Sequence, residues 1–159
     1  MKTFISKYWK LILSVLFGMT LFFFWDVLYP CYLSYQEQFQ LFLFDSNYFM
    51  ERVIVPGGLA DYIAEFFTQF YYIAFVGACI IAVILVLIQR ISWIIAKHEG
   101  ASDEYYATSF IPALLLWIYM GDENVLLSFI LACLASLVTC WGYVKLKQSR
   151  IYSLIYLIF

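Results

Sequence analysis

The sequence predicts an all-α protein: a polytopic transmembrane helix bundle with four spans, a partial or interfacial fifth, and amphipathic helices in its first outer loop. Three observations support this class. Hydrophobic residues make up 65% of the 159 residues and charged residues 13%, against about 45–50% and about 25% in soluble domains. Apolar runs recur at nearly the length that a bilayer requires. Basic residues flank these runs on one side.

Each predicted span is an apolar run of nearly 20 residues, the length that crosses about 30 Å of hydrocarbon. The spans cover residues 11–28, 70–88, 105–120 and 125–144, and the third is short and contains Pro112. A fifth run, 151–159, reaches only about 13.5 Å as a helix. We expect this run to be an incomplete span or an interfacial segment. We further expect a single transmembrane domain over 1–159, the N-terminal portion of a longer protein.

Lysine and arginine set the orientation of the spans. Basic residues precede the first span and follow the second and the fourth, and these segments all fall on one side. Arg52 is the one base among nine that is assigned to the other side. The pattern predicts a bacterial inner-membrane protein with a cytoplasmic N-terminus and an outer loop over 30–69. The bases on the inner side are Lys2, Lys7, Lys10, Arg90, Lys97, Lys145, Lys147 and Arg150.

The outer loop is predicted to hold short amphipathic helices. We expect one helix over about 48–55, a turn at 56–58 because proline and glycine favour turns, and a second helix over 59–69. In the second helix, apolar side chains recur at helical spacing, whereas Asp61 and Glu65 lie on the other face. Such a helix suits the membrane surface. It lacks a basic face, so we expect it to pack on the bundle.

Two spans carry small side chains at every fourth residue, which places them on one helical face. Small residues let helix backbones approach in lipid, so these faces are predicted to pack against other helices. The alternative is chance in an alanine-rich chain. The stripes are Ala74, Ala78 and Ala82 in the second span and Ser128, Ala132, Ser136 and Cys140 in the fourth.

Two carboxylates are candidate catalytic residues. Asp26 lies near the outer end of the first span, where an ionisable group usually faces a bundle interior or a wet cavity. The alternative is an interfacial acid that reaches water. Glu37 lies in the polar patch Gln36-Glu37-Gln38 within an aromatic stretch, where it would act as a base or bind a cation. The alternative is a solvated helix face.

Metal and nucleotide chemistry have little support in the sequence. Asp122 and Glu123 form a tight outer turn, and with Glu37 or Asp26 they would offer oxygen ligands to a divalent cation. The alternative is a polar turn. His98 is the single histidine, so no histidine pair exists for a metal. The net charge of −2 argues against a nucleic-acid partner, because binding phosphates needs a basic surface.

Two segments of the outer loop form the pattern E-Q-F-Q…P-G-G-L, at Glu37-Gln38-Phe39-Gln40 and Pro56-Gly57-Gly58-Leu59. This loop resembles the first outer loop of a bacterial family of multipass inner-membrane proteins of unknown function. The resemblance covers the first span, the loop and the second span. It implies a membrane protein and carries no assigned activity.

The predicted topology is also similar to that of multipass glycosyltransferases that use lipid-linked sugars. These enzymes share a cytoplasmic N-terminus, one span and then a large outer loop with surface helices, and an acid of that loop acts as base or metal ligand. The likeness implies a glycosyltransferase-like envelope enzyme that acts on a lipid-linked substrate at the outer face, with Asp26 or Glu37 as the matching acid. The alternatives are a non-enzymatic scaffold or anchor subunit and, third, a transporter fragment.

Overall fold

The described part of the chain is built of helices joined by short turns and one extended segment, residues 40–45. The computed structural model describes residues 2–146 and the side chains of residues 8–145. Three helices are long: α1 (Lys2–Phe23), α5 (Ala74–His98) and α7 (Leu127–Leu146). Within residues 2–146 no strand occurs, so the predicted all-α class is confirmed. The shorter elements are the π-helical η1 (Phe24–Leu28), α2 (Pro30–Phe39), α3 (Ser46–Ile54), α4 (Gly58–Thr68), the 3₁₀ helices η2 (Gln69–Tyr72) and η3 (Asp103–Phe110), and α6 (Ile111–Tyr119).

Within residues 2–146, three helical segments are long and apolar enough to cross a membrane: Tyr8–Leu28, Ala74–His98 and Leu127–Lys145. The first and last agree with predicted spans. The second begins four residues later than predicted, because Ile73 adopts an extended backbone that separates η2 from α5. The predicted fifth run, 151–159, lies outside the described residues.

The third predicted span, 105–120, is not one continuous α-helix. It is divided between η3 and α6, and Pro112 lies in the first turn of α6. Proline lacks a backbone N–H and is tolerated in a first turn, where that donor has no helical partner. The residues before it therefore form a separate 3₁₀ helix.

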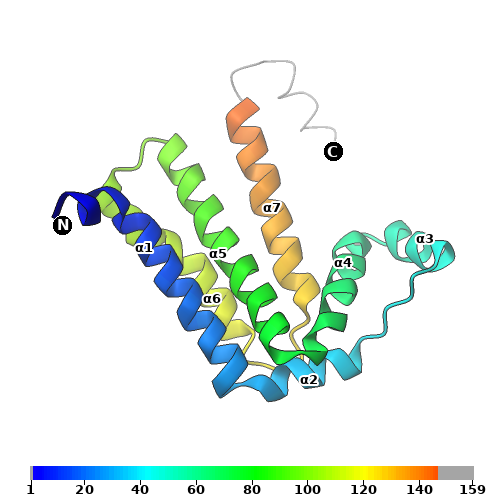
Figure 1. Ribbon diagram of the computed structural model, residues 1–159. Coiled ribbons are helices and arrows are strands. Elements are labelled where there is room, and N and C mark those ends of the chain that lie inside the picture. The colour runs from blue at the N-terminus through cyan, green and yellow to red at the C-terminus, as the bar shows by residue number, and fades with distance from the viewer. Residues whose placement is uncertain (1, 147–159) are drawn as a thin grey trace.

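The segments α1, α5, η3–α6 and α7 alternate in direction along the chain (Figure 1). In that view α1 and the η3–α6 segment both descend, whereas α5 and α7 both ascend. Side-chain pairs along α1 and η3–α6 confirm the parallel run: Lys10 pairs with Asp103, Phe17 with Phe110, and Phe24 with Trp117. The η3–α6 segment therefore returns the chain along the bundle between α5 and α7.

The two ends of the bundle are marked by contacts between distant segments. At one end, here the Asp103 end, the carboxylate of Asp103 lies 2.7 Å from Lys10 Nζ and 2.8 Å from Lys97 Nζ. At the other, the α2 end, the Tyr32 hydroxyl donates to the Val125 carbonyl at 2.9 Å. The chain thus travels from one end to the other between residues 103 and 125.

A buried polar network joins α1, α5 and η3 near the Asp103 end. Ser14 Oγ donates to Gln89 Oε1 at 2.8 Å and lies 2.7 Å from the Tyr106 hydroxyl oxygen. Gln89 Nε2 donates to Ser109 Oγ at 2.8 Å, and the Tyr106 hydroxyl donates to the Lys10 carbonyl at 2.7 Å. Hydrogen bonds between helices fix their register in a setting without competing water.

The two small-residue stripes differ in burial. On α5, Ala78 and Ala82 are buried in the core. On α7, Ala132 and Ser136 are exposed, although the sequence predicted that this face packs within the bundle. The reason is that α7 turns its larger apolar side chains, Leu127 and Ile130, toward the core instead.

Candidate functional site

The outer loop folds into a helical hairpin, α3–α4, whose turn is built by two glycines. Gly57 has φ +85°, a left-handed backbone that favours glycine. At Gly58 an added Cβ would lie 1.7 Å from the carbonyl oxygen of Arg52. Only glycine fits there, so the turn holds the last part of α3, with Arg52, directly against α4. The Pro-Gly-Gly-Leu segment thus has a structural role.

Arg52 joins Tyr48 and Glu65 in a compact polar group, here the Arg52 cluster. Arg52 Nη2 lies 2.6 Å from Glu65 Oε1 and donates to the Tyr48 hydroxyl at 3.0 Å. The Tyr48 hydroxyl in turn donates to Glu65 Oε2. Glu65 is only 8% exposed; Arg52 compensates its charge, and Tyr48 supplies a hydrogen bond to its second oxygen. Burial, then the hydrogen bond to Glu65, raises the pKa of Tyr48, which keeps this donor protonated.

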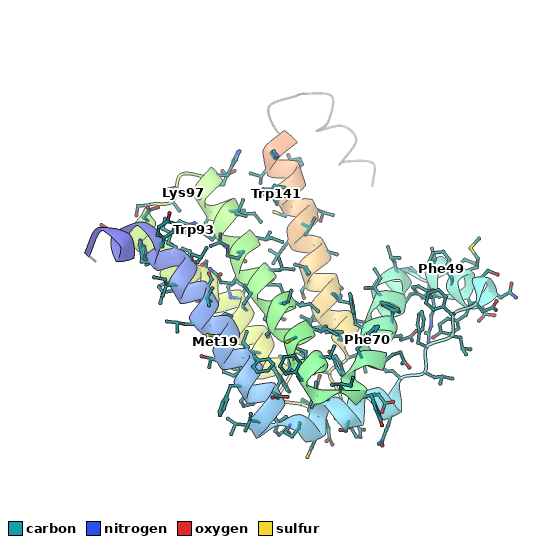
Figure 2. The ribbon with its side chains drawn as sticks, viewed as in Figure 1. Met19, Phe49, Phe70, Trp93, Lys97 and Trp141 are labelled. Carbon is teal, nitrogen blue, oxygen red and sulfur yellow. The ribbon has the colours of Figure 1, made fainter. Side chains whose placement is uncertain are left out.

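Part of the hairpin buries polar side chains and exposes apolar ones. Glu65 and Thr68 of α4 are buried, whereas Leu59 is 54% and Ile54 is 81% exposed. Phe49, at the far end of the hairpin in Figure 2, packs its ring on Tyr62 with a centroid distance of 4.9 Å. Polar groups inside and apolar groups outside suit an apolar surrounding. The predicted packing of α4 on the bundle holds, since Ala64 of α4 and Leu127 of α7 belong to one core.

Two small cavities adjoin the Arg52 cluster. One of about 310 Å³ lies between α3 and the start of α4, and the other of about 270 Å³ lies between α4, the end of α2 and the start of α7. Asp61 and Arg52 line both. The Asp61 carboxylate makes no hydrogen bond to a described residue. Its charge contributes to the raised pKa of Arg52, after the hydrogen bond that Arg52 donates to Tyr48 and the charge of Glu65. Asp61 is therefore a carboxylate available to a ligand.

Gln40 forms part of the wall of the second cavity and is held there by hydrogen bonds to neighbouring segments. Gln40 Nε2 donates to Gln36 Oε1 at 3.1 Å, and the Thr68 hydroxyl donates to Gln40 Oε1 at 3.3 Å. Gln36 Nε2 donates to the Glu123 carbonyl at 2.6 Å. These bonds tie α2 to α4 and to the turn before α7. They fix the position of that wall from three separate segments.

The predicted catalytic residues Asp26 and Glu37 lie outside these two cavities. Asp26 is in η1 and Glu37 is on α2, and both are partly buried. No hydrogen bond or ion pair joins them to each other. It is the neighbour of Glu37, Gln36, that is buried and makes contacts between segments. The catalytic roles of Asp26 and Glu37 stay predictions.

The predicted metal ligands Asp122 and Glu123 are exposed in the turn before α7. Asp122 Oδ1 accepts hydrogen bonds from the Asn124 backbone N–H at 2.9 Å and from its side-chain amide at 2.8 Å. These bonds lower the pKa of Asp122. Within the described ranges, no group of three or more His, Cys, Asp or Glu side chains is placed to hold a metal ion. Binding of a divalent cation stays a prediction.

The sequence interpretation missed Arg52, Asp61 and Glu65. A signal for the first was present, since Arg52 is the one base assigned to the outer side. The acids of 59–69 were recognised as one face of a helix, but the pattern does not say whether such a face meets water or protein. Only the hairpin brings Arg52 to Glu65, 13 residues further on.

Comparison with known proteins gives one match. A family model described as "Family of unknown function (DUF6057)" covers residues 7–159. The chain belongs to this family. The expected membership of an uncharacterised family is confirmed, and the DUF6057 match extends well past the first outer loop. Searches of the curated proteins and of the solved structures find no match. The Arg52 cluster and both cavities lie inside the DUF6057 region.

Proposed function

We propose that this DUF6057 chain is a multipass inner-membrane protein that crosses the bilayer four times. The contacts at the two ends of the bundle support a crossing by η3–α6, because that segment connects the Asp103 end to the α2 end. The eight 3₁₀ residues rise about 2.0 Å each and the nine α-helical residues about 1.5 Å each, together about 30 Å. That length equals the hydrocarbon thickness of about 30 Å.

The N-terminus is proposed to be cytoplasmic. Lys10 and Lys97 meet at the Asp103 end, and Trp93, Lys97 and Trp141 lie toward the same end in Figure 2. Tryptophan beside lysine is typical of a membrane interface, and an excess of basic residues marks the cytoplasmic side. Arg52 lies in the α3–α4 hairpin and is paired with Glu65.

The pocket around the Arg52 cluster is proposed to bind the polar end of an amphiphilic envelope substrate at the outer face. The observation that carries this proposal is the position of Asp61. Its carboxylate makes no hydrogen bond to a described residue, and it lines the same two cavities as the Arg52 guanidinium. The Nη1 donors of Arg52 have no hydrogen-bond partner among residues 8–145, and a guanidinium pairs well with phosphate. Phe39, 67% exposed at the rim, offers apolar contact to a lipid tail.

The proposed chemistry is glycosyltransferase-like, with a lipid-linked substrate in this pocket. A carboxylate near a reacting hydroxyl acts as general base and contributes about 10²–10⁴-fold to rate. Asp61 is our first choice for this role, beside the earlier candidates Asp26 and Glu37. Arg52 would hold the phosphate of the lipid carrier.

Single substitutions in the host cell test this activity. We expect Asp61→Asn to lower the envelope glycan made by the protein at least about 100-fold while the protein stays in the membrane at normal abundance. Arg52→Gln should lower the glycan as well, and also the abundance, because it leaves the buried Glu65 carboxylate without its ion-pair partner. Asp26→Asn and Glu37→Gln test the earlier candidates in parallel. Glu104→Gln is the matched control, because Glu104 is an exposed acid on η3 near the Asp103 end. Normal glycans in the Asp61 and Arg52 variants would exclude an enzymatic role for the pocket.

A non-enzymatic scaffold or anchor is the second candidate function. The exposed small-residue face of α7, with Ala132 and Ser136, favours it, because such faces associate with other helices in lipid. Under this alternative Asp61→Asn has no effect. Ala132→Leu instead releases a membrane partner that co-purifies with the unaltered chain.

A further inference from the structure

A long apolar groove lies between α1 and α5 and is separate from the two cavities at the Arg52 cluster. Its volume is about 730 Å³, within the range of about 300–1,000 Å³ typical of small-molecule sites. Its lining includes Val15 and Met19 of α1 and Val83 of α5, which are 52%, 63% and 57% exposed. The helices approach closely at Gly18, where an added Cβ would lie 3.1 Å from Val86 Cγ2.

One end of this groove carries a cation that has no partner among the side chains of residues 8–145. Arg90 lines the groove on the last third of α5, toward Lys97, and makes no hydrogen bond or ion pair with any described residue. Lys10 and Lys97 nearby both contact Asp103. An ionisable side chain in a membrane-length helix is costly unless a partner or water reaches it. Among Lys10, Arg90 and Lys97, Arg90 is therefore the side chain that can bind an anion without giving up an ion pair.

We propose that the groove binds one anionic phospholipid from the leaflet on the Asp103 side, with an acyl chain between α1 and α5 and the phosphate on Arg90. The inference rests on the proposed insertion in the membrane. From Leu11 to Phe23 the groove follows α1 for about 18 Å, close to one leaflet of a hydrocarbon core about 30 Å thick. The cytoplasmic leaflet carries anionic lipid, and a guanidinium matches phosphate in geometry.

Native mass spectrometry of the full chain in detergent tests this proposal, with phosphatidylglycerol and phosphatidylcholine as the two probes. We expect one retained lipid per chain and a preference of about fivefold for the anionic lipid, the effect of one basic residue at a membrane surface. Arg90→Gln should abolish the preference while weak retention persists. Lys97→Gln is the matched control, because Lys97 is already paired with Asp103.

The groove itself is tested by filling it. Val83→Trp should lower retention of both lipids at least about tenfold. Val138→Trp, at a 43% exposed position of α7 outside the groove, should leave it unchanged. Equal losses in the Arg90 and Lys97 variants, or equal retention in the two tryptophan variants, would overturn the proposal.

A photocrosslinking residue at Met19 identifies the occupant independently of those variants. Met19 lies on α1 (Figure 2) and lines the groove. A crosslinked phospholipid in membranes supports the proposal, whereas a crosslinked peptide of a second copy or of another protein contradicts it. Extraction of membranes with carbonate separates this result from the proposed function. If the chain stays embedded but captures no lipid, only the lipid site fails.

Discussion

Two buried tyrosines near the α2 end differ in how their hydroxyl groups are satisfied. Tyr32 is 3% exposed and donates to the Val125 carbonyl at 2.9 Å. Tyr71 is 1% exposed, and its hydroxyl has no hydrogen-bond partner among the residues that the structure describes. Burial raises the pKa of both, so both hydroxyls stay protonated. A buried polar group without a partner lowers the stability of the fold by its desolvation penalty, whereas a buried group with a hydrogen bond contributes net stability.

This difference predicts opposite effects of one chemical change. Tyr32→Phe should lower the free energy of unfolding by about 1 kcal/mol, because it removes a buried hydrogen bond. Tyr71→Phe should leave the stability unchanged or raise it by about 1 kcal/mol, because it removes an unsatisfied hydroxyl. Thermal unfolding of both variants in the same detergent measures the pair. A larger loss in the Tyr71 variant would mean that its hydroxyl has a partner in solution.

Asp103 links three segments through its carboxylate. Hydrogen bonds from Lys10 and then Lys97 lower its pKa from 3.8 to about 2. Lys10 Nζ also lies 4.7 Å from the centroid of the Trp93 ring. The Asp103 end of the bundle is therefore held by ion pairs that depend on an ionised acid.

The lowered pKa of Asp103 predicts an acid-dependent loss of stability. The contribution is fully present above pH 3.8, where the carboxyl is ionised in both folded and unfolded chains. It is lost as the pH falls toward about 2, where the folded carboxyl takes up a proton. Unfolding midpoints measured between pH 5 and 2 should show this loss. Asp103→Asn should remove the part of the pH dependence that comes from the Asp103 carboxyl. Glu104→Gln, which alters an unpaired neighbouring acid, should retain the full dependence.

At the scale of elements, the turn between α3 and α4 depends on two adjacent glycines for different reasons. Gly57 needs its left-handed backbone but has open space around it, whereas Gly58 faces the Arg52 carbonyl. Gly57→Ala should cost about 1–2 kcal/mol, the usual penalty of that conformation. Gly58→Ala should cost more, because the backbone itself must move.

Limited proteolysis of the hairpin is the measurement for these glycine variants. Cleavage within α3–α4 should be faster in the Gly58 variant than in the Gly57 variant, and slowest in the unaltered chain. The reverse order would show that the close contact at Gly58 is not maintained in the membrane.

The elements differ in how far the sequence predicts them. The runs that became α1 and α7 were recognisable because length and hydropathy are local properties. The periodicity of 59–69 predicted α4 within a residue or two, yet it did not predict that Glu65 points inward, because that depends on Arg52 reaching it. The division at Pro112 was not predicted, because apolar composition alone does not separate a 3₁₀ segment from an α-helix.

At the scale of the whole molecule, the number of crossings decides where the end of α7 lies. Four crossings place Lys10 and Lys145 on the same side, whereas a bundle that crosses only with its three longest helices places them on opposite sides. Cysteines at Ser34, Ser102 and Lys145, in a variant without the four native cysteines, distinguish these topologies. In intact cells, a membrane-impermeant reagent should modify only the cysteine at position 34. Labelling of the cysteine at 145 would contradict four crossings.

The candidate site could not be read from the sequence because it is assembled from distant segments. Its second cavity combines Gln40, Arg52, Asp61 and Ser128 from four elements. Each is an ordinary residue in its own segment, and their proximity follows from long-range contacts such as that of Gln36 with Glu123. Asp26 was conspicuous in sequence because it is an acid in an apolar run, a local signal that carries no information about neighbours.

The parallel pairing of α1 with η3 also bears on the order of events during synthesis. Lys10 and Ser14 meet partners that the ribosome makes 92 or 93 residues later, a delay of about 5 to 20 seconds at about 5–20 residues per second. In that interval α5 emerges first, and Gln89 can bond Ser14 before Tyr106 exists. A shortened chain that ends just after residue 100 would therefore keep the Ser14–Gln89 hydrogen bond between α1 and α5, but its Lys10 would lack the carboxylate of Asp103.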